Sequence, residues 1–234
     1  MGILGVGAIL LLAGGALGLL NPRGFSLRWL LVAVTLVVLN DLMLTNGYGL
    51  LPDLLPASDW NWQGKILALI TTLVVASLPV FGWRASGLTW AQGAGSLKSV
   101  LPVALLYVAF FTGLAVAFPS APATPETLAF QLTMPGLEEE LFYRGVLLLA
   151  LDRAFTGRRR ILGVEWGWGA LLSCLLFGLA HAFGVSEGRV SLDLVTMALT
   201  AVPSLIGVWI VLRTRSVHLP VVLHNFGNAI TLLL

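Results

Sequence analysis

The sequence predicts an all-α membrane protein, a polytopic bundle of about eight transmembrane helices. Its 234 residues are 58% hydrophobic and only 10% charged, and the mean hydropathy is +0.94, whereas soluble domains are about half apolar and a quarter charged. A membrane helix needs about 20 mostly apolar residues. Eight segments have about this length and composition: 2–20, 29–46, 66–83, 97–118, 128–151, 168–185, 192–212 and 217–234.

The connections between these segments alternate in charge. Basic residues gather in the first, third, fifth and seventh connections, and the fifth contains three consecutive arginines at 158–160. Cytoplasmic loops carry an excess of Lys and Arg, so these four connections are predicted to be cytoplasmic and both termini to lie on the outer side. Because topology explains the basic residues, the net charge of +2 does not indicate binding of nucleic acid. The pattern is typical of a multi-pass protein of an inner (plasma) membrane.

A proline-rich stretch divides the chain. Pro119, Pro122 and Pro125 predict a stiff, extended link between the fourth and fifth segments. The predicted units are therefore 1–125, with four apolar helices that carry few ionisable groups, and 126–234, which carries the polar residues considered next.

The fifth apolar segment has charged residues in its interior. Glu138, Glu139, Glu140 and Arg144 together cost about 10 kcal/mol to insert, at about 2.5 to 3.5 kcal/mol each, while the apolar residues return about 3 to 6 kcal/mol. The segment is therefore predicted to be surrounded by other helices, with its charges paired or facing a water-filled cavity. The alternative is a helix that ends at the membrane interface, but the apolar run continues from 141 to 151.

Helical spacing separates two of these glutamates. Glu140 and Arg144 are four residues apart, so they share a helix face and are predicted to form an ion pair. Glu139 is turned by about 100° from Glu140. It is therefore free to meet a partner from another helix.

Two later segments hold pairs of residues at helical spacing. Phe177 lies four residues before His181, and His224 lies four residues before Asn228. Taken alone, His181 fits a packed core histidine and Phe177 fits ordinary packing. His224 and Asn228 can donate hydrogen bonds to a developing negative charge, or they can form an interhelical hydrogen bond. Asn40 and Asp41, in the second segment, are interpreted as residues that form a hydrogen bond in the bundle or extend to the interface, with a catalytic role as the alternative.

Together these residues resemble the motifs of a known family. No GxSxG, HExxH or P-loop pattern occurs, which argues against serine-type and site-2-type intramembrane proteases. In order and spacing, the three sets resemble the EExxxR, FxxxH and HxxxN motifs of the CAAX-processing and bacteriocin-processing (CPBP) family of intramembrane proteases. The matching residues are Glu139, Glu140 and Arg144, then Phe177 and His181, then His224 and Asn228. The resemblance covers about residues 126–234.

The resemblance implies a role for each residue. It implies that Glu139 and His181 activate a water molecule, and that His224 and Asn228 form an oxyanion hole. The supporting residues would be Glu140, Arg144 and Phe177. The implied activity is hydrolysis of a peptide bond in a membrane-embedded or lipid-attached peptide or protein, without a cofactor.

Other mechanisms and functions remain open at this point. Glu139, His181 and His224 could instead hold a divalent metal, although the glutamate route is favoured because it gives His224 and Asn228 a clear role. A non-proteolytic binding or immunity protein of the same family is the alternative function. An ion-coupled transporter is a third, but the sequence has no recognisable inverted repeat. Prenylated CAAX ends, bacteriocin leaders and C-terminal sorting tails are all conceivable substrates.

Overall fold

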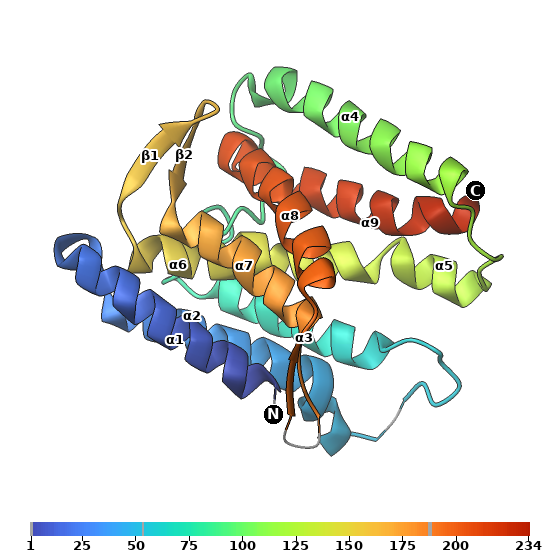
Figure 1. Cartoon of the computed structure of the whole chain (residues 1–234), viewed down its shortest axis with the longest axis horizontal. Helices are drawn as coiled ribbons and strands as arrows, with labels where there is room; N and C mark the ends of the chain where they lie inside the picture. The colour runs from blue at the N-terminus through green and yellow to red at the C-terminus, as the bar shows by residue number, and fades with distance from the viewer. Residues whose placement is uncertain (1, 53, 187–188) are drawn as a thin grey trace.

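The computed structural model describes residues 2–52, 54–186 and 189–234, and it confirms an all-α helical bundle (Figure 1). Each of the eight predicted segments falls on helix. Seven of them correspond to α1 (Gly2–Leu20), α2 (Leu27–Asp41), α3 (Trp62–Ser77), α4 (Ser96–Ala117), α7 (Trp168–Ala182), α8 (Leu194–Thr214) and α9 (His218–Leu233). The fifth segment consists of α5 (Pro125–Gln131), a π-helix named η4 (Gly136–Leu147) and α6 (Leu148–Ala154).

Among the described residues, three helices are long and apolar enough to cross a membrane: Leu27–Thr45, Ser96–Ala117 and Leu194–Thr214. The first of these joins α2 to the π-helical turn η2 (Leu42–Asn46), which the 3-10 turn η3 (Gly47–Leu50) follows. Leu4–Leu20 of α1 and the whole of α3 and α7 are shorter apolar helices. Large side chains such as Leu12, Leu106 and Leu199 are at least 70% exposed on the outside of the bundle, as expected of surfaces that face lipid.

The predicted boundaries of α3 are wrong by several residues. The helix begins at Trp62 and not at residue 66, because Asn61 caps it by accepting a hydrogen bond from the Gly64 N–H at 2.9 Å. It ends at Ser77, just before Leu78 and Pro79, and not at residue 83. Lys65 therefore lies in the first turns of the helix and not in the preceding loop.

Two short antiparallel hairpins were not predicted. The strands β1 (Arg158–Ile161) and β2 (Val164–Gly167) form the first, and β3 (Phe183–Ser186) and β4 (Arg189–Leu192) form the second. In the first hairpin, Leu162 and Gly163 both have positive φ, at 50° and 77°, which matches the twist that two-residue hairpin turns require. The second hairpin shortens the predicted segment 168–185, because α7 ends at Ala182.

The four basic connections lie at one end of the bundle. The Ser26 N–H donates to the Ala154 carbonyl, and the Thr156 N–H donates to the Gly24 carbonyl. At the same end, the Val217 N–H donates to the Gly87 carbonyl, and the Trp209 indole donates to Leu162 in the β1–β2 hairpin. Figure 1 shows the α1–α2 turn and this hairpin near each other. The arrangement agrees with the common side predicted from the charge pattern.

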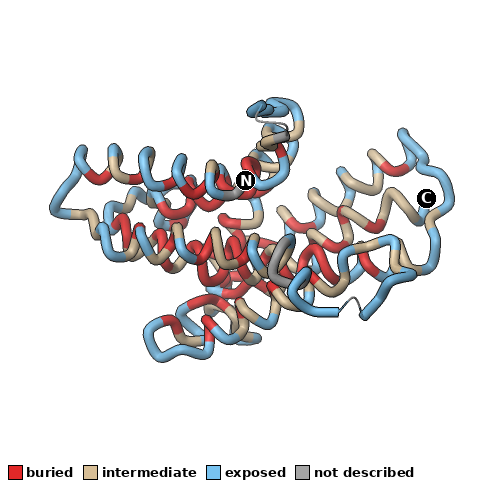
Figure 2. The backbone as a smooth tube through the Cα atoms, turned by 90° about the horizontal axis from the view of Figure 1, so that it is seen from below, coloured by how far each residue is buried: buried red, intermediate tan, exposed pale blue. Residues whose placement is uncertain are grey.

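The main hydrophobic core joins helices from the first half of the chain to η4, α6 and α7. Its fully buried members include Leu30 and Ala33 from α2, Val146 and Leu147 from η4, and Leu151 from α6. Figure 2 shows buried residues on the inward sides of the helices and exposed residues on the outward sides. The N-terminal helices thus support the π-helix from one side. The division into units at residue 125 stays a prediction.

The loop before α3 is attached to α5 through Glu126. The Glu126 carboxylate accepts hydrogen bonds from the Ser58 hydroxyl, from the Trp62 indole at 3.1 Å and from the Asp59 N–H at 3.3 Å. Beside it, Trp60 stacks on Phe130 with ring centroids 4.7 Å apart. These contacts tie the segment after the proline-rich link to the N-terminal part of the chain.

This attachment is expected to weaken in acid. The hydrogen bond from Ser58, with smaller contributions from the other donors, lowers the pKa of Glu126 below its ordinary value of 4.5. A carboxyl with a lowered pKa in the folded state stabilises that state above its unfolded pKa, and this contribution is lost as the pH falls through the folded pKa. Hydrogen exchange of amides 54–60, corrected for the intrinsic pH dependence, should therefore show protection at neutral pH that disappears in acid. Glu126→Gln should lack most of this protection at neutral pH, whereas Glu165→Gln, on the exposed part of β2, should match the wild type.

Candidate active site

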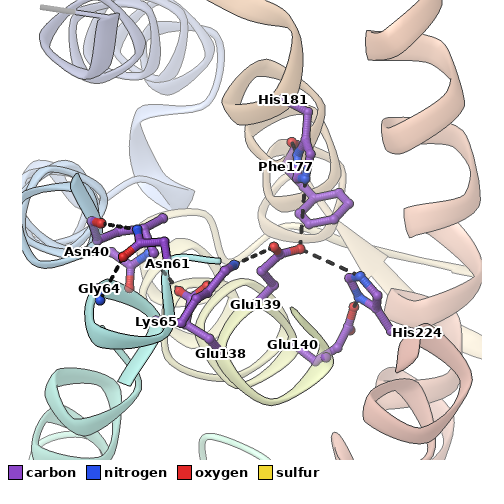
Figure 3. A network of polar contacts seen from close by, with 12 residues as sticks. Asn40, Asn61, Gly64, Lys65, Glu138, Glu139, Glu140, Phe177, His181 and His224 are labelled. Carbon is purple, nitrogen blue, oxygen red and sulfur yellow. Dashed lines mark hydrogen bonds and ion pairs between the residues drawn. The ribbon is translucent and has the colours of Figure 1, made fainter. Parts of the chain in front are cut away.

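The π-helix η4 directs three consecutive glutamates to different partners. π-Helices are rare and frequently occur at functional sites. Glu138 points toward α2 and α3, where it accepts a hydrogen bond from Asn40 at 3.0 Å. Glu140 lies 3.2 Å from the Arg144 guanidinium, so the predicted ion pair is present, as is the bundle hydrogen bond of Asn40. Glu139 projects between the other two (Figure 3).

The two carboxylate oxygens of Glu139 have different surroundings. Oε1 accepts a hydrogen bond from the Lys65 ammonium at 2.6 Å. Oε2 faces Nε2 of His224 at 3.7 Å and Nε2 of His181 at 3.9 Å. Oε2 is buried, and no donor in the described part of the chain lies within hydrogen-bond distance of it. The two distances to imidazole are too long for direct hydrogen bonds. The geometry fits a small polar group between the three atoms.

Both imidazoles are held by their Nδ1 atoms. His181 Nδ1 lies 2.8 Å from the Phe177 carbonyl oxygen, one helical turn earlier. His224 Nδ1 lies 2.8 Å from Oε1 of Glu140. Because a carbonyl and a carboxylate accept hydrogen bonds, each Nδ1 carries the proton, and we infer the tautomer from these partners. In a neutral ring Nε2 is then an acceptor, and both Nε2 atoms face Glu139 (Figure 3).

Phe177 and Arg144 form one wall of the site. The Arg144 guanidinium lies over the Phe177 ring, 4.1 Å from its centroid, and the Phe177 ring lies 4.6 Å from the His181 ring. Arg144 is buried. Its guanidinium forms an ion pair with Glu140, but the two groups are not aligned for a hydrogen bond. A cation over an aromatic face is stabilised further when it is desolvated.

Asn228 lies farther along α9 and donates a hydrogen bond from Nδ2 to Gln131 at 3.1 Å. An amide nitrogen has two hydrogens, so the second is available to a ligand. Its neighbour Asn225 has a different function: it accepts from the Gly136 N–H at 2.7 Å and donates to the Thr133 carbonyl at 3.1 Å. Asn225 thereby fixes the start of the π-helix. The sequence analysis did not single it out, although it is a second amide in the same apolar segment.

All seven predicted site residues line one cavity of about 820 Å³. Aromatic and aliphatic side chains from α4, α8 and α9 form much of its wall, among them Tyr107, Phe111, Ile210 and Leu223. A mostly apolar cavity with a few convergent polar groups is typical of a ligand or active site. The polar groups gather at the π-helix.

Lys65 is the functional candidate that the sequence analysis missed. The predicted third segment, 66–83, leaves Lys65 in the preceding connection, whereas its ammonium lies inside the bundle between Glu138 and Glu139. The sequence does mark Lys65 in one way: it is a single cation in a connection whose other charged residues are aspartates.

Among the described residues, no group of three or more His, Cys, Asp or Glu side chains has an arrangement that could hold a metal ion.

The fold and the cavity define a class: a helical membrane protein with a carboxylate and two imidazoles inside its bundle. Residues 121–230 match the family model of the type II CAAX prenyl endopeptidases, Rce1-like. The match confirms the resemblance to the CPBP family for this part of the chain. It contains all three motifs, while the first four apolar helices lie outside it. No significant match to a curated protein or to a solved structure is found.

Proposed function

We propose that the protein is an intramembrane endopeptidase that hydrolyses a peptide bond of a membrane-associated peptide or protein. The observation that carries the proposal is the convergence of two imidazole Nε2 atoms on Oε2 of Glu139, within 3.7 and 3.9 Å. The CPBP family match supports the same class of reaction. The apolar helices support a multi-pass position in an inner, or plasma, membrane.

In the proposed reaction, a water molecule lies between Glu139 and His181. Oε2 of Glu139 takes one proton of this water, and Nε2 of His181 accepts a hydrogen bond from the other hydrogen, which orients the oxygen for attack on the peptide carbonyl carbon. The attack forms a C–O bond and a tetrahedral oxyanion. When the C–N bond breaks, the proton held by Glu139 passes to the leaving amine, and the carboxylate is restored.

His224 and Asn228 are proposed to stabilise the oxyanion. Asn228 can donate its free amide hydrogen, and His224 can donate from Nε2 when its ring is protonated. The Glu140 carboxylate, 2.8 Å from Nδ1 of His224, holds the ring with Nε2 facing Glu139. Preorganised donors of this kind stabilise developing charge by several kcal/mol, and removal of one typically lowers kcat by about 100- to 1,000-fold.

The proposal is tested by cleavage in labelled water. Purified protein in lipid nanodiscs is incubated with a prenylated C-terminal peptide or a membrane-inserted peptide library, and the products are analysed by mass spectrometry. One atom of labelled oxygen in the new carboxylate supports hydrolysis. A peptide that binds but is not cleaved would favour a non-proteolytic binding or immunity protein. Peptide uptake into vesicles without cleavage would favour a transporter.

His181→Ala is expected to retain binding of the peptide while losing cleavage. His181 orients the water and does not hold the bundle together, because its one hydrogen bond from Nδ1 stays within its own helix. We expect kcat to fall by about 100-fold or more, the usual range for a general acid-base group, with KM changed little. The control is His218→Ala. His218 is the remaining histidine of the chain and lies at the start of α9, so its replacement should leave kcat near that of the wild type. Equal kcat in His181→Ala and the wild type would remove His181 from the mechanism.

A further inference from the structure

Lys65 connects the first half of the chain to the site. It lies on α3, outside the residues that match the family model. Its ammonium is 2.6 Å from Oε1 of Glu139 and 2.7 Å from Oε2 of Glu138, and its side chain is only 12% exposed (Figure 3). Long cationic side chains at helix ends usually extend toward the membrane surface. Lys65 instead points inward, to the two carboxylates.

We propose that Lys65 is a positioning residue that fixes the Glu139 carboxylate so that Oε2 faces the two imidazoles. This inference rests on the proposed function. A charge-assisted hydrogen bond to Oε1 leaves Oε2 as the free oxygen of the pair, and it is Oε2 that approaches His181 and His224. The sequence motifs of the site supply the base and the imidazoles, and α3 supplies the group that sets the orientation of the base.

The distribution of partners makes Glu139 dependent on Lys65. Glu138 has a second donor, the Asn40 amide at 3.0 Å, and Glu140 has Arg144 and His224. Apart from the two imidazoles, Lys65 is the one cationic side chain in the described structure within ion-pair distance of Glu139. Glu138 therefore helps to hold the ammonium in place, and the ammonium holds Glu139.

The start of α3 is itself anchored, which keeps Lys65 in register. The Asn61 amide donates to the Leu44 carbonyl at 2.8 Å, and its Oδ1 accepts from the Gly64 N–H at 2.9 Å. A Cβ at residue 64 would collide with the Leu44 carbonyl oxygen, so the close approach of α3 to η2 requires glycine. Lys65 follows directly after this contact point, one residue beyond the glycine.

The main test separates positioning from simple charge neutralisation. Lys65→Met leaves two neighbouring carboxylates without their cation and can fail to fold, so the informative variant is Lys65→Met/Glu138→Gln, which removes one charge of each sign. We expect this double variant to keep a wild-type melting temperature and KM, while kcat falls by about 100-fold, the usual cost of a misplaced catalytic group. A kcat within about 3-fold of the wild-type value would be a much smaller loss than this, and it would overturn the proposal.

Three companion variants complete the comparison. Lys65→Arg/Glu138→Gln restores a cation beside Glu139 and should recover part of the lost kcat. Glu138→Gln alone keeps the pair of Lys65 and Glu139 and should stay much more active than the double variant with methionine. Lys98→Met removes the other lysine of the chain, an exposed residue of α4, and should match the wild type. No recovery with arginine, when that protein folds and binds peptide, would count against a positioning charge.

Amine labelling separates failure of this inference from failure of the proposed function. An acylating reagent reacts with the neutral amine, so an ammonium paired with two carboxylates should react at least about 10-fold more slowly than exposed Lys98, equivalent to about 1.4 kcal/mol. The rate at Lys65 should rise in Glu138→Gln/Glu139→Gln. If the wild type cleaves no peptide, the proposed function fails while this measurement still tests the contact. Equal labelling of Lys65 and Lys98 in the wild type would overturn the positioning of Glu139 by Lys65.

Discussion

Replacing Glu139 by glutamine is expected to lower kcat for peptide cleavage by about 1,000-fold, within the range that loss of a general base produces. Glutamine has nearly the same shape as glutamate but cannot take the proton of water at Oε2, where both imidazoles converge. Peptide binding should change little, since the cavity wall is otherwise intact. The measurement is single-turnover cleavage in nanodiscs, together with peptide affinity for the same preparation.

A chelator distinguishes the two mechanisms in the same assay. In the glutamate route, wild-type cleavage persists after prolonged treatment with a strong chelator, whereas a metal-dependent route loses activity that a divalent ion then restores. Glu165→Gln, at an exposed position on β2, is the matched control and should retain wild-type kcat. Wild-type activity in Glu139→Gln would rule out Glu139 as the base.

The positions of the helices could be predicted because length and hydropathy alone select apolar segments. The kind of helix in the fifth segment could not be predicted in this way. The π-helix η4 depends on tertiary contacts such as the hydrogen bond from the Gly136 N–H to Asn225, and its residues have no distinctive periodicity. The two hairpins were missed for a similar reason, since strands of four residues, such as Arg158–Ile161, are too short to establish an alternating pattern.

The gathering of the site residues could be predicted from motif spacing and from the cost of charge in lipid. Glu139, His181 and His224 do line one cavity, and Glu140 and Arg144 do form an ion pair. Their catalytic roles stay proposals. The Nδ1 partners of the imidazoles could not be foreseen in full, because the contact of His224 with Glu140 joins two helices.

The inward direction of the Lys65 side chain could not be predicted from the sequence. A lysine near the end of an apolar segment can extend to the interface or fold inward, and only the surroundings decide between these. Here Asn61 caps the helix at Gly64 and also donates to the Leu44 carbonyl, which Gly64 allows the helix to approach closely. The contact with Leu44 comes from η2, whose position hydropathy and motif spacing do not locate.

Arg144→Met is expected to destabilise the folded protein by about 3 to 5 kcal/mol, the usual effect of removing one partner of a buried ion pair. Arg144 is 3% exposed, lies 3.2 Å from Glu140 and covers the Phe177 ring at 4.1 Å. Its loss leaves the Glu140 carboxylate buried, with the His224 imidazole at 2.8 Å as its remaining ion-pair partner among the described residues. Unfolding by denaturant in mixed micelles, followed by circular dichroism, measures the change. Arg159→Met, on the exposed part of β1, should differ from the wild type by less than about 0.5 kcal/mol.

The double variant Arg144→Met/Glu140→Gln distinguishes an electrostatic cause from lost packing. If the destabilisation comes from an unpaired carboxylate, removing its charge should restore most of the lost stability, because a neutral side chain has a much smaller desolvation cost. Cleavage should stay low in this variant, since His224 then lacks the carboxylate that holds its ring at Nδ1. Stability that remains as low as in Arg144→Met would instead assign the effect to the contact between the guanidinium and the Phe177 ring.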